Sequence, residues 1–252
     1  MRNVIIILVC LCIILPANAA KLAIIIDDIG YRLTDEAALT LPQNITLSVL
    51  PHTPLGQKLA NDGYKKGHEI MLHLPMQALN GKALGPGGLT NDMSESQIKQ
   101  QLQSAFKSIP FAKGANNHMG SLLTQMDDPM LWVMQSLKQQ QLFFVDSVTT
   151  KYTKASDTAN KLGVPLLRRE VFLDNDVSQH GLEKQFTAMI KKAKQQKKLV
   201  AIAHPYPETI RYLHANLDRL ADNGIVLVQA SQLFDDIHLA TSSHTNPTAT
   251  LK

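Results

Sequence analysis

Short apolar runs alternate with longer amphipathic stretches along most of the chain. Several of these runs are apolar without alternation, which is typical of strands buried on both faces of a sheet. The pattern predicts strands at residues 22–26, 45–50, 69–72, 113–116, 142–145, 171–173, 199–203 and 225–228. Helices are predicted at residues 95–108, behind a capping box formed by Ser94 and Gln97, and at 128–137, 182–197 and 207–223.

The order of these elements predicts the fold class. Strand and helix alternate about eight times, which implies a parallel sheet with helices outside it, either a barrel or a doubly wound sheet. No shift in composition and no repeat divides the chain, so we expect a single domain over residues 21–237. The polar residues 238–252, which are rich in Ser and Thr, are predicted to form a flexible C-terminal tail.

The N-terminus has the pattern of a secretory signal peptide. A short basic start precedes an apolar run at residues 4–15, which is too short to span a bilayer comfortably, and Ala17 and Ala19 supply a small-x-small cleavage site. We therefore expect residues 1–20 to be removed and the protein to be exported, most simply to a bacterial periplasm. An uncleaved anchor is the alternative. Cys10 and Cys12 are the cysteines of the chain, so the mature protein has no disulfide.

Composition and charge exclude some classes of function. Hydrophobic residues make up 44% and charged residues 18%, which is ordinary for a globular protein and excludes wholesale disorder. Lys and Arg number 25 against 21 Asp and Glu, and this mild excess does not indicate a nucleic-acid partner. After cleavage of the signal we expect no stable membrane anchor. The sequence leaves the oligomeric state open.

Polar residues fall where the predicted strands end. Because the carboxyl ends of parallel strands meet on one face of the fold, we expect these side chains to lie close together. The strand ends carry Asp27-Asp28, His73, Asn116-Asn117-His118, Asp146, Asp174 and His204. Carboxylates and imidazoles gathered in one place need a cation or protons to offset their charge. Asp and His without a thiol suit a divalent metal, most simply Zn²⁺ with one position left for water.

Each of these residues also has an ordinary structural interpretation. Asp27 and Asp28 are compatible with a turn or a helix cap, and His73 is compatible with a core histidine that bonds to the backbone. Asp146 and Asp174, taken alone, are more typical of caps and turns. The coincidence of six polar strand ends favours a common site over six separate structural roles.

Several motifs resemble a known family. Residues 22–28 (LAIIIDD), 67–73 (GHEIMLH) and 202–204 (IAH) are similar, in this order, to motifs of the polysaccharide deacetylases. Residues 116–121 and 144–147 resemble segments of the divergent, YibQ-like branch of that family. The resemblance runs over essentially the whole mature domain. It implies a distorted (β/α) barrel of seven or eight parallel strands, of the NodB-like type.

The resemblance also implies roles for individual residues. Asp27 corresponds to the catalytic base, Asp28 and His73 to metal ligands, and His204 to the general acid. A second metal-binding His would stand at position 77, where this chain has Gln77, and an amide oxygen is a poor zinc ligand. We take His118 as the candidate third ligand and His204 as the fallback.

The remaining candidate residues are assigned to substrate binding. They are Asn117, Asp146, Arg169 and Asp174, with Arg168 and Arg169 as candidates for the positive group that the missing Arg-rich third motif supplies elsewhere in the family. Asn117 and backbone amides near Leu74 are candidates for binding an oxyanion. The glycine-rich residues 81–88 are expected to form a wall of the substrate site.

The function implied is metal-dependent removal of N-acetyl or similar acyl groups from a cell-envelope glycan such as peptidoglycan. The alternative is a weak or inactive protein of the same fold that binds glycan or an envelope partner. Gln77 and the low aromatic content, 5% with a single Trp, favour this alternative, whereas the complete set of Asp27, Asp28, His73 and His204 favours an enzyme. A third hypothesis is that the protein is a metal-dependent hydrolase of another ester or amide.

Overall fold

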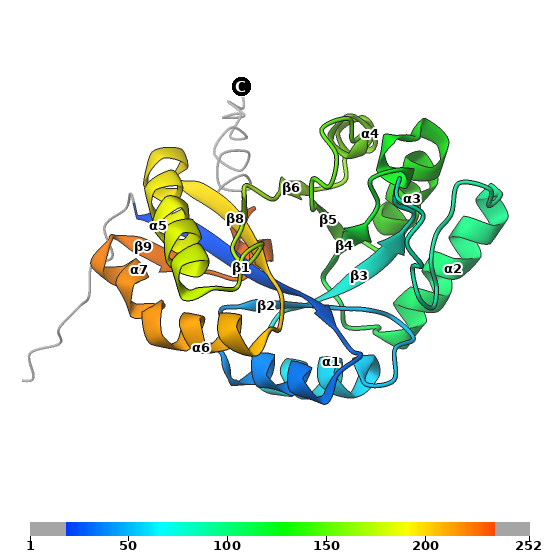
Figure 1. Cartoon of the computed structure of the whole chain (residues 1–252). Helices are drawn as coiled ribbons and strands as arrows, with labels where there is room; N and C mark the ends of the chain where they lie inside the picture. The colour runs from blue at the N-terminus through cyan, green and yellow to red at the C-terminus, as the bar shows by residue number, and fades with distance from the viewer. Residues whose placement is uncertain (1–18, 235–252) are drawn as a thin grey trace, which may run out of the picture.

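A computed structural model describes residues 19–234, and these form a parallel sheet wrapped by helices (Figure 1). The sheet curves into an incomplete barrel whose strand order is β6-β5-β4-β3-β2-β1-β8-β7, with β9 beside β1. The strands are β1 (Ala20–Ile29), β2 (Thr46–Val49), β3 (Ile70–Met76), β4 (Gly114–Met119), β5 (Phe143–Asp146), β6 (Leu166–Arg168), β7 (Val171–Phe172), β8 (Lys198–Ala203) and β9 (Ile225–Leu227). The predicted distorted barrel of parallel strands is therefore confirmed, with eight strands along the path of the sheet and the short β9 added beside β1.

Helices cover the outer face of the sheet. They are α1 (Gly56–Lys65), α2 (Glu95–Ser108), α3 (Asp127–Gln139), α4 (Ala155–Leu162), α5 (Gln179–Gln196), α6 (Pro207–Asn216) and α7 (Asp218–Asp222). Three 3₁₀ segments, η1 (Leu33–Thr40), η2 (Leu123–Gln125) and η3 (Ala230–Leu233), join them within the described residues. The predicted capping box of α2 is present, since Ser94 accepts a hydrogen bond from the Gln97 amide and Gln97 accepts one from Ser94.

The continuous apolar runs form strands because both faces of the sheet are buried. In β1, Leu22, Ile24 and Ile26 pack into the core between sheet and helices. The alternate residues Ala23 and Ile25 pack into a second apolar cluster, which includes Ala230 and Leu233 of η3. Lateral pairing in register with β8 extends over most of β1. A strand of this kind needs no polar face, which is why its sequence shows no alternation.

The sequence pattern missed helices α1 and α4, strand β6 and the 3₁₀ segments. Helix α1 contains two glycines and buries few large apolar side chains, and strand β6 has only three residues, two half-buried and one exposed, so each offers few apolar positions to a sequence pattern. Helix α4 spans eight residues. The predicted helix at 207–223 is two helices, α6 and α7.

The predicted tail and all but the last two residues of the predicted signal peptide lie outside the described residues. Ala20 already begins β1, one residue before the expected start of the domain. In the part of the chain that the structure describes, no helix is long and apolar enough to cross a membrane.

Candidate metal centre

Two adjacent carboxylates at the end of β1 reach the same histidine. Successive side chains of a regular strand point to opposite faces. The pairing of β1 with β2 shifts register between Ile26 and Ile29, and Asp28 has a left-handed backbone with φ of 60°. His73 Nε2 consequently lies 3.7 Å from Asp27 Oδ2 and 3.0 Å from Asp28 Oδ1. The irregular end of β1 thus directs both carboxylates into the site.

Asp28, His73 and His118 bring three ligand atoms together. Asp28 Oδ1 lies 2.7 Å from His118 Nδ1 and 3.0 Å from His73 Nε2, and the two ring nitrogens are 3.2 Å apart. Tetrahedral zinc with ligands at 2.0–2.1 Å separates its ligand atoms by about 3.3 Å. Asp28 Oδ1 is buried and, within residues 19–234, makes no hydrogen bond of good geometry. A carboxylate oxygen facing two imidazole nitrogens at these separations fits a divalent cation such as Zn²⁺.

Asn116 connects the metal-ligand candidates to the candidate base. Its Oδ1 accepts hydrogen bonds from His73 Nδ1 at 2.7 Å and from the Ser48 hydroxyl at 2.6 Å. Its Nδ2 donates to both oxygens of Asp27, at 2.8 and 3.0 Å. A proton held on His73 Nδ1 leaves Nε2 as the ring nitrogen that can bind a cation, as metal-binding histidines require. Sequence reasoning placed Asn116 among the polar strand ends of the site but gave it no individual role.

The surroundings move the pKa values of the two carboxyls in opposite directions. Burial raises the pKa of Asp27 above its ordinary value, although His73 and His204 oppose the shift. Burial alone would also raise the pKa of Asp28, but the interactions with His118 and His73 lower it well below the ordinary range. A carboxylate with a raised pKa is suited to accepting a proton, and one with a depressed pKa is suited to holding a cation.

His204 is held against the cluster by a buried carboxylate. Asp174 accepts a hydrogen bond from His204 Nδ1 at 2.9 Å and from the backbone N–H of His204 at 2.6 Å, and Thr209 donates to it at 3.0 Å. This arrangement leaves His204 Nε2 facing the site, 3.9 Å from Asp28 Oδ2. Burial alone would lower the pKa of His204, but the bond to Asp174 raises it to about 9. A histidine with a pKa above neutrality carries a proton at pH 7, which is the state that a general acid needs.

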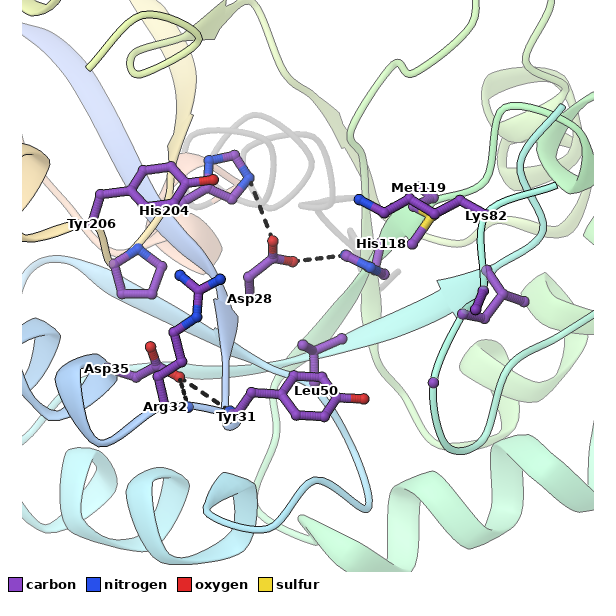
Figure 2. A pocket seen from close by; sticks show the side chains of 14 residues that line it. Asp28, Tyr31, Arg32, Asp35, Leu50, Lys82, His118, Met119, His204 and Tyr206 are labelled. Carbon is purple, nitrogen blue, oxygen red and sulfur yellow. Dashed lines mark hydrogen bonds and ion pairs between the residues drawn. The ribbon is translucent and has the colours of Figure 1, made fainter. Parts of the chain in front are cut away.

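A cavity of about 440 Å³ opens over these residues (Figure 2). Asp28, His118 and His204 form its floor, and Tyr31, Arg32 and Tyr206 border one side. Residues 82–85 border it as well, as expected for the glycine-rich loop. The volume is within the range of about 300–1,000 Å³ for small-molecule sites.

The four residues predicted to bind substrate do not line this cavity. The cavity lining within residues 19–234 includes none of Asn117, Asp146, Arg169 and Asp174. Asp174 is enclosed and holds His204, and Asp146 is buried and accepts from the Val148 amide. The geometry therefore gives these side chains a supporting position, in place of the expected contact surface.

Asn117 and Arg169 brace the chain that follows β5. Asn117 accepts from the Ser147 amide at 2.9 Å and donates to the Met119 carbonyl at 2.6 Å. Arg169 donates to the carbonyls of Ser147 and Val148, and its guanidinium lies 3.7 Å above the Phe172 ring. These hydrogen bonds tie Asn117 and Arg169 to the backbone after β4 and β5, so both side chains are placed to stiffen the base of the site.

Gln77 points away from the cluster. Its side-chain oxygen accepts a hydrogen bond from the Asn91 amide at 2.7 Å, which directs it toward the loop after residue 88. His118 instead supplies the third ligand atom of the cluster from the neighbouring strand, where Pro75 of β3 pairs with His118 of β4.

Comparison with known proteins identifies similar sequences. A family model described as divergent polysaccharide deacetylase matches residues 24–234. The uncharacterized protein YibQ of Escherichia coli K12 is 38% identical over 243 residues, which cover 96% of this chain and 76% of that relative.

Solved structures share the fold at low sequence identity. The uncharacterized protein ATU2773 of Agrobacterium tumefaciens C58 has a TM-score of 0.83 at 21% identity, covering 86% of this chain and 90% of that chain. BA3943 of Bacillus anthracis, described as a CE4 family pseudoenzyme, has a TM-score of 0.55 at 12% identity, covering 87% of this chain and 66% of that chain. A mutant of BA3943 is described as having restored enzymatic activity.

Proposed function

The chain belongs to the divergent polysaccharide deacetylase family, and we propose that it is a metal-dependent hydrolase that removes N-acetyl or similar acyl groups from a glycan. The observation that carries the proposal is the convergence of Asp28, His73 and His118 beneath an open cavity. Asp27 lies 3.7 Å from His73, and His204 lies 3.9 Å from Asp28. A protein that only binds glycan has no need for a paired base and acid.

The proposed reaction is hydrolysis of an amide or ester, in which water and the acyl compound give a carboxylate and a free amine or alcohol. When bound to Asp28, His73 and His118, a divalent cation such as Zn²⁺ supplies an activated water and polarises the acyl carbonyl. Asp27 accepts the proton of the attacking water, and Asn116 holds its carboxylate in place. His204 Nε2 donates a proton to the leaving nitrogen or oxygen while Asp174 holds its ring.

The proposed substrate and compartment rest on the predicted signal peptide. If residues 1–20 direct export, the acylated polymer that the protein meets is a cell-envelope glycan, with peptidoglycan as the first candidate. The competing proposal is a non-catalytic envelope protein that binds glycan, which is favoured by Gln77 at the position where a metal-binding His is expected. Metal content and acyl release together separate the two.

The test combines elemental analysis with turnover. We expect the purified protein to bind about one equivalent of Zn²⁺ and to release acetate from an acetylated glycan panel. Asp28→Ala should lose the metal and keep the fold, as judged by circular dichroism. Asp27→Asn should keep the metal and lose turnover by about 10²–10⁴-fold, the usual size of a general base contribution.

Asp157→Asn is the matched control, because Asp157 is exposed on α4 away from the cavity. This variant should match the wild type in metal content and rate. Metal binding without acetate release from any glycan or ester would support the non-catalytic alternative. Unchanged metal content in Asp28→Ala would exclude the proposed ligand set.

A further inference from the structure

We propose that the cavity selects substrates bearing a carboxylate or a phosphate close to the acyl group, and that Arg32 and Lys82 are the residues that bind this anion. The inference rests on the proposed function, because the anion is taken to lie close to the acyl group that is hydrolysed. Binding of the anion depends on two cations, Arg32 and Lys82, that take no part in the proposed reaction. Both residues line the cavity above the metal-ligand candidates.

Arg32 enters the cavity from a fixed turn after β1. Asp35 Oδ2 accepts hydrogen bonds from the backbone N–H groups of Gly30, Tyr31 and Arg32, at 3.0, 3.1 and 2.9 Å. This clamp holds the Arg32 backbone, while its exposed guanidinium makes no hydrogen bond or ion pair with the rest of residues 19–234. Figure 2 shows Arg32 among the residues that line the cavity, on the same side as Tyr206. The turn thus presents a cation whose donors are open to a ligand.

Lys82 reaches the cavity from the opposite side. It belongs to the glycine-rich loop, and its backbone N–H donates to Asn80 Oδ1 at 3.1 Å. Its side chain is exposed, and its ammonium group contacts no acidic group among the residues that the structure describes. Figure 2 shows it near Met119 and His118, across the cavity from Arg32. Two separate segments therefore place positive charge on opposite sides of one opening.

The charges nearby do not cancel these two cations. In the zinc-loaded protein Asp27 and Asp28 offset the divalent cation of the proposed function. In the metal-free protein Asp28 Oδ1 faces the ring nitrogens of His73 and His118, at 3.0 and 2.7 Å. The charge of Asp35 is satisfied by three backbone donors in either form. Exposed Lys and Arg are common on protein surfaces and alone indicate nothing. Here both border a cavity of about 440 Å³, where partial exclusion of water strengthens their attraction for an anion. Arg in addition offers the two-pronged donor pattern that matches carboxylate and phosphate.

The aromatic content of the cavity is consistent with this. A neutral sugar is usually held by stacking on aromatic rings. Among the described lining residues, Tyr31 and Tyr206 are the aromatic side chains other than histidine. Stacking on these two rings is open to neutral and charged sugars alike, so Arg32 and Lys82 are what distinguishes an anionic ligand from a neutral one.

The experiment measures binding in zinc-loaded and metal-free protein by calorimetry. The probes are N-acetylmuramic acid, its methyl ester, N-acetylglucosamine 6-phosphate and N-acetylglucosamine. We expect at least one of the two anions to bind 10-fold or more tightly than its neutral counterpart, in both forms of the protein. The carboxylate and phosphate arms decide which anion is preferred, and the metal-free arm excludes simple coordination of the anion to zinc.

Substitutions assign the preference to the two cations. Arg32→Gln and Lys82→Gln should each reduce anion affinity severalfold and leave affinity for the neutral probes and the zinc content unchanged. Arg211→Gln and Lys161→Gln are matched controls, because both side chains are exposed on helices away from this cavity. Equal affinity for the charged and neutral probes, no saturable binding of either anion, or an anion preference that survives both substitutions would overturn the inference.

The two proposals fail separately. Selective anion binding that depends on Arg32 and Lys82, without acyl release from any substrate, keeps this inference and removes the proposed hydrolase. Acyl release at equal efficiency from charged and neutral substrates keeps the hydrolase and removes the anion site.

Discussion

At the scale of single residues, Asn116 has the most connections in the site. One fully buried amide bonds to Asp27, His73 and Ser48 at once, so that β1, β2, β3 and β4 are joined through a single side chain. Its acceptor oxygen requires the Nδ1–H tautomer of His73, and its donor nitrogen requires an acceptor at Asp27. The same group therefore fixes the protonation of a ligand and the position of the base.

Replacing this amide should weaken metal binding without abolishing the ligands. We expect Asn116→Ala to reduce zinc affinity about 10–100-fold, the effect typical of losing a partner that orients a ligating histidine. Competition with a chromophoric chelator measures the affinity. Asn160→Ala, on the exposed face of α4, is the control and should leave it unchanged. Wild-type zinc affinity in folded Asn116→Ala would show that His73 needs no such orientation.

At the scale of elements, the turn after β1 determines the position of both carboxylates. Gly30 follows Asp28 by two residues with φ of 140°, and a Cβ added there would overlap the Thr53 hydroxyl. Its carbonyl accepts the Leu55 amide and its N–H donates to Asp35. The irregular strand end and the tight turn are thus one packed unit, in which no larger residue fits.

Gly30→Ala should therefore disturb stability and site together. Left-handed strain and the overlap with Thr53 should lower the free energy of unfolding by about 2–4 kcal/mol and reduce bound zinc. Urea unfolding and elemental analysis measure the two effects. Gly163→Ala is the control, because Gly163 also has positive φ but a Cβ there meets no atom within 4 Å. The free energy of unfolding of Gly163→Ala should fall by only about 1–2 kcal/mol, the cost of the left-handed backbone, and its zinc content should be unchanged.

At the scale of the whole molecule, an ion-pair network joins the helices on the C-terminal side of the barrel. Glu183 of α5 accepts hydrogen bonds from Arg219 of α7, at 2.8 Å through each oxygen, and from Tyr212 of α6 at 2.6 Å. The bond to Arg219, followed by that to Tyr212, lowers the pKa of Glu183 from 4.5 to about 2. The network packs these helices against the sheet side that carries His204.

This depressed pKa predicts a pH-dependent effect on stability. The ionised Glu183 contributes stability fully above about pH 4.5, and the contribution is lost as pH falls toward 2. Glu183→Gln should therefore lower the free energy of unfolding by about 1 kcal/mol at pH 7, after screening by solvent, and by progressively less at pH 4 and pH 3. Urea unfolding across this range measures it, with Glu95→Gln, in an exposed pair with Lys99, as the control. A difference that stays constant with pH would contradict the assignment.

Most of the sheet could be predicted because strands buried on both faces are visible as apolar runs. The apolar runs of β1 and β8 could be predicted as strands without knowing that these two strands pair with each other. By contrast, β6 and α1 are short and half-exposed, and their conformation depends on the pairing and packing that neighbours provide. Local periodicity carries no such information.

The site was predicted in outline for a similar reason. Strand ends of a parallel sheet meet at one edge, so Asp28, His73 and His118 could be grouped from the sequence. The orientation of individual side chains could not be predicted. Asp174 was expected at the substrate surface and lies behind His204, because its partners, the His204 N–H groups and Thr209, are thirty or more residues away in the chain.

The amino-acid sequence by itself determined the parallel fold, the family and the set of chemical groups at the sheet edge, because apolar runs and motif order are local properties of the chain. Only the tertiary structure decided that both β1 carboxylates face one histidine, that Asn116 ties ligand to base, and that Arg32 and Lys82 face each other across the cavity. Those relations depend on backbone irregularity and on hydrogen bonds between distant residues, such as Asn116 and Asp27, 89 positions apart.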